Sequence, residues 1–194
     1  MVMDVVLASR SPRRTDLLDL LGVPHRAVPS GISEEPLPGE GAEAQVVRLA
    51  RRKAEHVASL EPRADLVIGA DTLVVLDGSA MGQPGDAAEA AQMLRRLSGR
   101  THTVLTGMCL LRDGERAEGV SSTGVTFHRL SEAEIAWYVG TGEPMDKAGA
   151  YAAQGIGAVF LRRIEGSFHN VVGFPLDLFY QLLPQMRISL RDLL

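Results

Sequence analysis

Three arginines flank a serine-proline pair near the start of the chain, where residues 9–14 read Ser-Arg-Ser-Pro-Arg-Arg. Ser11 followed by Pro12 is typical of a helix start, because the hydroxyl can cap free amides and proline fits the first helical position. A helix N-terminus already carries positive partial charge and attracts anions, so arginines there are unfavourable for the helix alone. The segment therefore indicates a bound polyanion, with a solvated basic turn as the alternative.

Asp71 is a second candidate, in a stretch Gly-Ala-Asp-Thr that separates two apolar segments. A carboxylate in apolar surroundings is unfavourable unless it is paired or bound to a cation. The alternative is a turn aspartate that hydrogen-bonds its own backbone. Strand-forming residues on both sides favour a paired or cation-binding carboxylate at the end of a strand.

A third candidate is residues 146–157, in which small side chains would let the backbone approach a ligand closely. Asp146, Lys147 and Gln154 add directed polar groups to this segment. It lacks the spacing of a P-loop, and no dinucleotide-binding glycine motif follows the first strand. Taken alone, the segment is a weak indication of a binding loop.

The composition argues against several classes of protein. A net charge of −4 is not typical of a general nucleic-acid binder. The mean hydropathy is +0.05, the apolar runs are too short to cross a bilayer, and the first residues do not form a signal peptide. The single cysteine, Cys109, cannot form an internal disulfide, and the histidines lack metal-ligand spacing. We therefore expect a cytoplasmic protein.

Strand and helix patterns alternate along the chain, and Asp-Gly pairs at 77–78 and 113–114 predict tight turns between strands. Capping signals at Asp86 and Ser131 predict further helix starts, and an amphipathic pattern predicts a helix over 42–60. Crossover helices and tight turns together predict an α/β domain on a mixed sheet. The predicted strands are residues 4–8, 66–69, 73–76, 101–111, 117–130, 155–164 and 168–172.

Several of these segments resemble the signature blocks of the Maf family. The blocks are residues 7–14, 53–54, 69–72, 98–102, 146–151, 164–168 and 171–175, in this order along most of the chain. Maf proteins are nucleoside triphosphate pyrophosphatases, also described as septum-formation inhibitors. The resemblance implies a single domain over residues 1–194, with an elongated mixed sheet, helices on both sides and two lobes around a central cleft. This fold is related to that of inosine triphosphate pyrophosphatases.

The resemblance also implies roles at the phosphates. The residues that would hold the triphosphate are Ser9, Arg13 and Arg14, and those that would line the reacting phosphate are Glu34, Lys53 and Asp71. Asp71 would be the proton acceptor. Because a free aspartate titrates at about 3.9 and is a poor base near neutrality, we expect a divalent cation, Mg²⁺ or Mn²⁺, with Asp71 and Glu34 as ligands.

At the base, Arg13, Thr72 and Gln154 resemble the trio that marks the branch hydrolysing dTTP and UTP. The Gln154 carboxamide can both donate to and accept from a pyrimidine edge. Lys147, in the block 146–151, is a further candidate for substrate contact. Gln83 stands where the family usually has a lysine, so we expect weaker phosphate neutralisation and slower turnover than in a lysine-bearing relative.

We therefore expect an enzyme that cuts dTTP and UTP to the monophosphate and pyrophosphate, with modified pyrimidine nucleotides as further candidates. One alternative is a preference for 7-methyl-GTP. Another is a nucleotide-sensing regulator of cell division without catalysis, for which Gln83 is the only sequence support. Neither nucleic acid nor a membrane is an expected partner, and a homodimer, common in the family, is left open.

Overall fold

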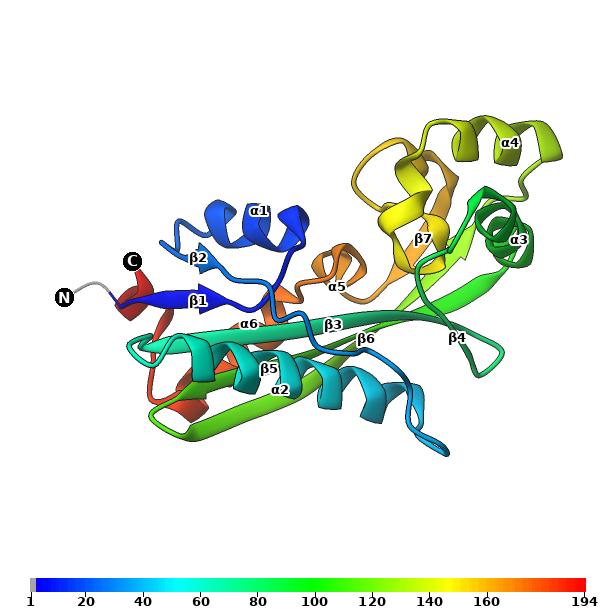
Figure 1. Ribbon diagram of the computed structural model, residues 1–194. Helices are drawn as coiled ribbons and strands as arrows, with labels where there is room; N and C mark the ends of the chain where they lie inside the picture. The colour runs from blue at the N-terminus through cyan, green and yellow to red at the C-terminus, as the bar shows by residue number, and fades with distance from the viewer. Residues whose placement is uncertain (1–2) are drawn as a thin grey trace. The chain divides into compact units, whose positions relative to one another are not determined.

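The computed structural model describes residues 3–194, and within them seven strands form one mixed sheet (Figure 1). They are β1 (Val5–Leu7), β2 (Arg26–Ala27), β3 (Leu66–Leu76), β4 (Ser79–Met81), β5 (Thr101–Arg112), β6 (Glu115–Phe127) and β7 (Leu161–Glu165). The order is β2-β1-β3-β5-β6-β7, with β4 paired to β3. β1 is parallel to β2 and β3, whereas β3–β4 and β6–β7 are antiparallel. The predicted α/β class with a mixed sheet is confirmed.

Two helices begin at the capping signals that predict them. Ser131 and Glu134 form a reciprocal capping box, and Asp86 caps a helix by accepting the amide N–H of Glu89. Asp77, in the β3–β4 turn, has a left-handed backbone with φ of 51°. The helices are α1 (Pro12–Leu20), α2 (Ala42–Leu60), α3 (Ala87–Leu97), α4 (Glu132–Gly140), α5 (Phe168–Val172) and α6 (Leu176–Leu182). Short 3-10 segments are Glu143–Asp146, Ala148–Ala150, Ile156–Phe160, Leu183–Met186 and Leu190–Leu193.

The chain divides into two compact units. The first contains the chain up to Asp71 together with Thr106–Ser121 and Gly173–Leu194. The second contains Thr72–Leu105 and Ser122–Val172. Strands β3, β5 and β6 contribute residues to both units, and the expected cleft between two lobes stays a prediction.

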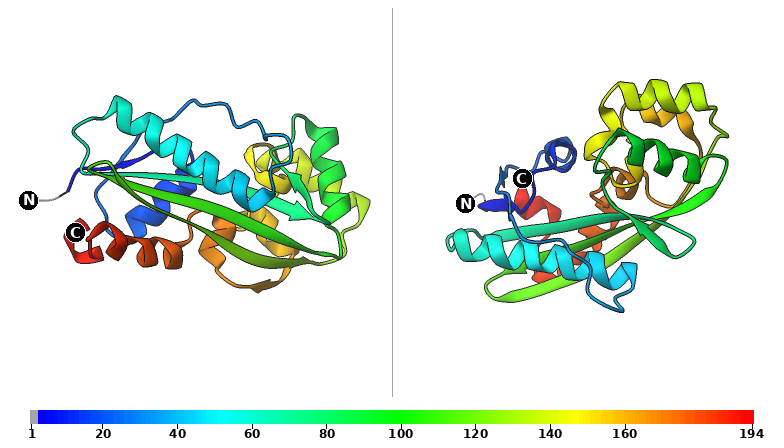
Figure 2. Two further views of the ribbon diagram at one scale, coloured as in Figure 1. Left: turned by 90° about the horizontal axis from the view of Figure 1, so that it is seen from below. Right: turned by 45° about the vertical axis from the view of Figure 1, so that its right-hand side comes forward.

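In the first unit, the sheet is covered on both faces. Val6 and Val67 are register partners of β1 and β3, and they share a buried cluster with Ala50 of α2. Because side chains alternate along a strand, Leu7 and Ile68 face the other way, and they too are fully buried. Figures 1 and 2 show α1 and α2 on opposite sides of these strands. The expectation of helices on both sides therefore holds for this unit.

The second unit has an aromatic core of its own. The rings of Phe127 and Tyr151 pack edge-on with centroids 4.8 Å apart, and those of Tyr138 and Phe160 do so at 5.1 Å. His102 contacts both Phe127 and Tyr151, and its Nε2 lies 2.8 Å from the Tyr151 hydroxyl. Apolar side chains of α3 and α4 surround these rings. Ala150 and Tyr151, in the segment that follows α4, are part of this buried core.

The prediction of two separate strands, over residues 66–69 and 73–76, is wrong, because β3 is continuous over Leu66–Leu76. Asp71 therefore lies in the middle of a strand and not at its end. A turn aspartate is excluded for the same reason.

The strand predicted over residues 168–172 is also wrong, because these residues form α5. Ser167 Oγ accepts the amide N–H of Asn170 over 3.3 Å, and the Asn170 carboxamide donates to the Val104 carbonyl over 3.0 Å. These side-chain bonds stabilise a helical turn where apolar β-formers predicted a strand. Residues 156–160, predicted as strand, form a 3-10 segment before β7.

Within residues 3–194, no helix has both the length and the apolar character that crossing a membrane requires. Cys109 lies in the buried cluster beside α2. Burial is the main cause that raises the pKa of its thiol to about 12.

Candidate active site

Lys53 of α2 lies between two carboxylates in the first unit. Its Nζ is 2.6 Å from Asp71 Oδ1 and 2.7 Å from Glu34 Oε1. The Lys53 and Asp71 side chains are buried, whereas the Glu34 side chain is 56% exposed. One ammonium group therefore faces two acids from segments far apart in the sequence. We refer to these three residues as the Lys53 cluster.

Two glycines bring α2 close enough to the sheet for this contact. A Cβ at Gly69 of β3 would lie 2.1 Å from the Ala50 carbonyl oxygen, and a Cβ at Gly107 of β5 would lie 2.3 Å from that of Val46. The backbone of α2 therefore rests directly on the sheet at both points. Because side chains alternate along a strand, Asp71 is on the same face as Gly69 and lies toward α2.

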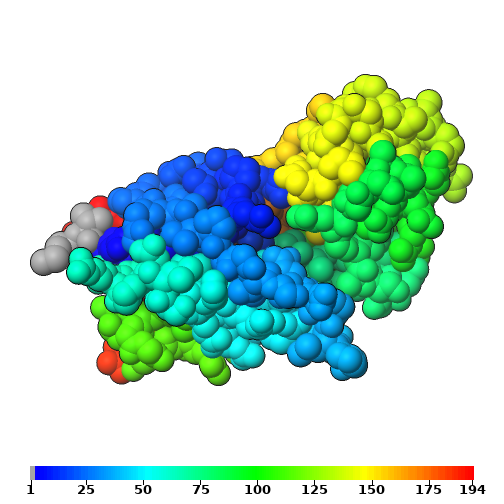
Figure 3. Space-filling view, in the orientation of Figure 1, coloured from blue at the N-terminus to red at the C-terminus, as the bar shows by residue number. Residues whose placement is uncertain are grey.

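The loop that carries Glu34 is tied to α2 by Arg48. Arg48 Nε and Nη2 donate to the two carboxylate oxygens of Glu40, each over 2.6 Å, and Nη2 also donates to the Glu35 carbonyl over 3.1 Å. Figure 3 shows this loop, in lighter blue, against α2, in cyan. Because Arg48 holds this exposed loop against α2, the Glu34 side chain can reach Lys53 on the same helix.

Arg14, at the start of α1, is buried next to the same acids. Its Nε donates to the Gly173 carbonyl over 2.8 Å, and its Nη1 donates to the Ala70 carbonyl over 2.9 Å and to Ser9 Oγ over 3.2 Å. Ser9 Oγ also accepts the amide N–H of Ser11 over 3.0 Å. Ser11 itself makes no side-chain cap hydrogen bond, so the capping role predicted for it is wrong.

The charges in this region shift one another's protonation. Burial lowers the pKa of Arg14; the Asp71 charge opposes this, and the Arg13 charge adds to it. Burial raises the pKa of Asp71, which Lys53 and Arg14 offset only in part, while Glu34 raises it further. Asp71 is therefore a better proton acceptor near neutrality than a free aspartate, and it lies beside cations that can stabilise an oxyanion.

Asp71 and Glu34 are also the residues expected to bind a divalent cation. Mg²⁺ prefers oxygen ligands and is usually held by one or two carboxylates together with substrate phosphates. Two carboxylates that share one ammonium group lie close enough together to serve in this way. Within residues 3–194, no three His, Cys, Asp or Glu side chains form a metal-binding group. Asp71 and Glu34 would therefore supply only part of the coordination of such a cation, and oxygens of the substrate phosphates would have to supply more.

Arg13, half-buried on α1, also lies in the first unit, whereas Thr72, Gln83, Lys147 and Gln154 lie in the second. Gln83 Nε2 donates to the Asp146 carbonyl over 3.2 Å, and Lys147 Nζ pairs with the Asp146 carboxylate. Asp146 therefore connects Gln83 and Lys147. Thr72, which follows the Lys53 cluster along β3, is half-buried, and Gln83 and Gln154 are exposed.

Sequence patterns miss several residues that build the site, among them Gly173, Gly69 and Arg48. Gly173 has a φ of 110°, which favours glycine, and its carbonyl accepts from Arg14. Its signal in the sequence is the Gly-Phe-Pro run at 173–175. Gly69 has the signal of a glycine inside an apolar strand, which often marks a close backbone approach. Arg48 has no recognisable signal, because its role depends on a loop eight residues away.

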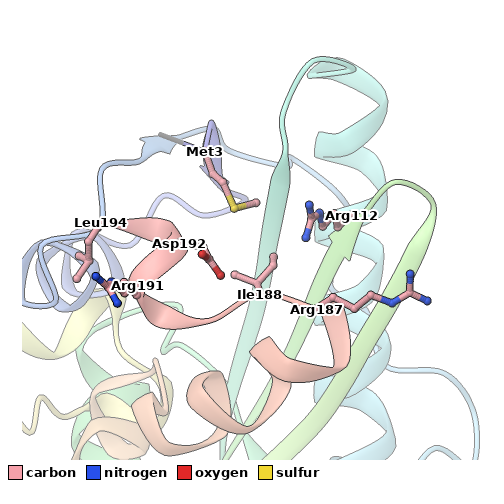
Figure 4. A pocket seen from close by; sticks show the side chains of 7 residues that line it. All are labelled: Met3, Arg112, Arg187, Ile188, Arg191, Asp192 and Leu194. Carbon is pink, nitrogen blue, oxygen red and sulfur yellow. The ribbon is translucent and has the colours of Figure 1, made fainter. Parts of the chain in front are cut away.

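A separate pocket of about 550 Å³ lies in the first unit, lined mainly by residues close to the C-terminus (Figure 4). Its charged side chains are Arg112, Arg187, Arg191 and Asp192. These differ from the predicted site residues, so this pocket is distinct from the Lys53 cluster.

The family described as "Maf-like protein" matches residues 4–186. The chain is 51% identical over 181 residues to a protein of Anaeromyxobacter sp. (strain Fw109-5) named dTTP/UTP pyrophosphatase, covering 91% of this chain and 86% of the relative. Proteins of the same name from Salmonella typhimurium (strain LT2) and Escherichia coli O6:K15:H31 (strain 536) are 50% and 49% identical over 186 and 177 residues. These matches cover 96% and 91% of this chain and 94% and 90% of the relatives.

Proposed function

The chain belongs to the Maf family, and on that premise we propose that it hydrolyses dTTP and UTP to the nucleoside monophosphate and pyrophosphate. Relatives at about half identity over most of the chain carry that name. The observation that supports it most directly is the Lys53 cluster, in which a buried carboxylate lies 2.6 Å from an ammonium group. This combination of a proton acceptor and a cation suits the attack of water on a triphosphate.

Hydrolysis of the bond between the α- and β-phosphates needs an oriented water, neutralised phosphoryl oxygens and a stabilised leaving group. In this proposal, the oxygen of the water forms a bond to the attacked phosphorus while Asp71 accepts a proton from that water. The bond between this phosphorus and the bridging oxygen breaks. Lys53, Arg13 and Arg14 balance the charge on the phosphoryl oxygens, and Ser9 supplies a further contact. A divalent cation held with Asp71 and Glu34, when bound, would acidify the water and add positive charge.

The family resemblance assigns the remaining proposed substrate contacts. Gln154 offers a donor and an acceptor to the pyrimidine base, together with Thr72 and Arg13. Lys147 is a further proposed substrate contact, and Gln83 would lie on the phosphate side. The exposure of Gln154 and Gln83 is compatible with direct contact to a ligand.

The wider role follows from the family and the composition. A net charge of −4 and a single cysteine support action on free nucleotides in the cytoplasm. Restraint of septum formation and pairing of two chains are further proposals that come from the family alone.

The test is a pyrophosphate-release assay on purified protein with dTTP, UTP and 7-methyl-GTP, with and without Mg²⁺. We expect dTTP and UTP to be the preferred substrates, with Mg²⁺ required. Asp71→Asn should lower kcat/KM by about 10³-fold, the range for loss of a general base, without loss of folded structure by circular dichroism. Release of orthophosphate, or a preference for 7-methyl-GTP, would refute the proposal.

A further inference from the structure

Tyr138 and Glu143 bind both ends of one loop in the second unit. The Tyr138 hydroxyl accepts the amide N–H of Ala152 over 3.1 Å and donates to Glu143 Oε1 over 2.8 Å. Glu143 Oε1 also accepts the amide N–H of Gly157, and Oε2 accepts that of Ile156, each over 2.9 Å. The backbone from 152 to 157 is therefore held at its start and at its end by one pair of side chains.

This arrangement depends on close packing. Tyr138 is fully buried, and its ring packs on Phe160. A Cβ at Gly157 would lie 2.4 Å from the Tyr138 hydroxyl, and a Cβ at Gly155, whose φ is 132°, would lie 2.5 Å from Glu143 Oε2. Both glycines thus allow the loop to reach the two side chains.

Glu143 is held as a carboxylate. Burial acts to raise its pKa, but the amide hydrogen bonds from Gly157 and Ile156, the Tyr138 hydroxyl and the charge of Lys147 outweigh burial and lower it. A charged oxygen acceptor makes these hydrogen bonds stronger than neutral ones.

The amides of Ile156 and Gly157 are not available to a phosphate, because the Glu143 carboxylate already accepts both of them. What the loop presents instead is Gln154. It is exposed and has the one side chain with polar atoms within residues 152–160. Its carboxamide both donates and accepts, which matches the adjacent carbonyl and N–H of a uracil or thymine ring.

We propose that Tyr138 and Glu143 are positioning residues that hold Gln154 for recognition of the pyrimidine base. This inference rests on the proposed function and deepens it. The two side chains do not touch the substrate; they fix the backbone on both sides of the residue that does.

Tyr138→Phe removes the hydroxyl and retains the ring that packs on Phe160. We expect KM for dTTP and UTP to rise about tenfold, equivalent to about 1.4 kcal/mol, with kcat little changed. The preference for dTTP over a purine triphosphate such as dATP should fall by the same factor. Glu143→Gln is the second variant and should act in the same direction, because an amide cannot accept at both positions.

Hydrogen–deuterium exchange gives a readout apart from activity. Peptides covering residues 151–160 should exchange about fivefold faster or more in Tyr138→Phe and Glu143→Gln than in the wild type. The matched control is Ser131→Ala, which removes the cap of α4, where the Ser131 side chain bonds Glu134. It should lower thermal stability and leave both loop exchange and pyrimidine preference unchanged.

A double-mutant cycle separates positioning from general damage. If Tyr138 acts through Gln154, the Tyr138→Phe/Gln154→Ala double variant should be no less selective than Gln154→Ala alone. Additive losses, or unchanged loop exchange, would overturn the inference while leaving the proposed function in place. A wild-type chain without pyrimidine preference would instead refute the proposed function itself.

Discussion

At the scale of single residues, Asp71 is subject to opposing influences. Burial favours its neutral form, and Lys53 and Arg14 favour the carboxylate. The balance raises its pKa above that of a free aspartate, which makes it a better proton acceptor. Lys53, 2.6 Å away, is the main charge that opposes burial.

Lys53→Gln should therefore raise the pKa of Asp71 further. In the proposed mechanism the ionised Asp71 carboxylate accepts the proton, so the acidic limb of the profile of kcat/KM against pH should move to higher pH. The maximum should fall about 10²-fold through loss of the proposed contact between Lys53 and the phosphates. Arg52→Gln is the matched control, because Arg52 is the next residue of α2 and is exposed. An acidic limb that stays in place in Lys53→Gln would contradict this account of Asp71.

Gln83 tests whether the substrate region lacks a positive charge. Gln83→Lys can keep the donor that reaches the Asp146 carbonyl and adds a cation. We expect kcat/KM for dTTP to rise about threefold to tenfold, the effect of about 1 kcal/mol. Gln83→Met, which has neither the charge nor the donor, should not gain. No increase in the lysine variant would show that another group already neutralises the phosphates.

At the scale of elements, the site depends on how closely α2 approaches β3 and β5. The glycines at 69 and 107 leave room for the helix backbone on the sheet. Asp71 then lies on the rigid interior of a strand, and Lys53 lies on the helix face that packs on the sheet. Two regular elements, and not flexible loops, thus set the 2.6 Å contact.

Gly69→Ala should disturb this arrangement, because its Cβ would lie 2.1 Å from the Ala50 carbonyl oxygen. We expect the free energy of unfolding in urea to fall by about 3 kcal/mol, with a loss of kcat in the fraction that stays folded. Gly140→Ala is the control: a Cβ there meets no atom within 4 Å. It should leave stability equal or slightly higher. Equal effects in the two variants would refute the close approach at Gly69.

Elements with strong local signals were predictable from the sequence. The capping box at Ser131 and the helix over 42–60 agree with the structure. The interruption predicted at 70–72 does not agree, because β3 is continuous there. A glycine such as Gly69 breaks an apolar pattern as a turn would, but here the glycine makes room for the α2 backbone. Local pattern cannot distinguish these two causes.

The candidate site shows the same division. Charge and spacing alone singled out the arginines near α1 and Asp71, but Glu34 and Lys53 entered through the family resemblance. The contact between Glu34 and Lys53 depends on the loop that Arg48 fixes to α2. It also depends on the close packing of that helix on the sheet. Such contacts join distant parts of the chain and leave no periodic trace in the sequence.

At the scale of the whole molecule, stability depends on pH through His102. This residue is buried among aromatic rings, and burial lowers its pKa from 6.5 to about 4. Within residues 3–194, its Nδ1 has no hydrogen-bond partner. His102 is therefore protonated near pH 6.5 in the unfolded chain but only near pH 4 in the folded chain. The free energy of unfolding consequently falls as the pH decreases through this interval.

By pH 5, this difference should lower the free energy of unfolding by about 2 kcal/mol relative to pH 7.5. His102→Gln should remove that part of the pH dependence, measured by urea unfolding at both pH values. His128→Gln, at an exposed position, should behave like the wild type. If His102→Gln lost as much free energy of unfolding between pH 7.5 and pH 5 as the wild type, other groups would be responsible for the pH dependence.

Cys109 is the single cysteine of the sequence, and it is buried with its sulfur held as the thiol. Maleimides and other thiol-directed reagents thus have no accessible target on the native chain. A cysteine introduced at a chosen surface position becomes the sole attachment point for a dye or a spin label. Fluorescence or EPR distance measurements could then start from the natural sequence, without first replacing its own sulfur.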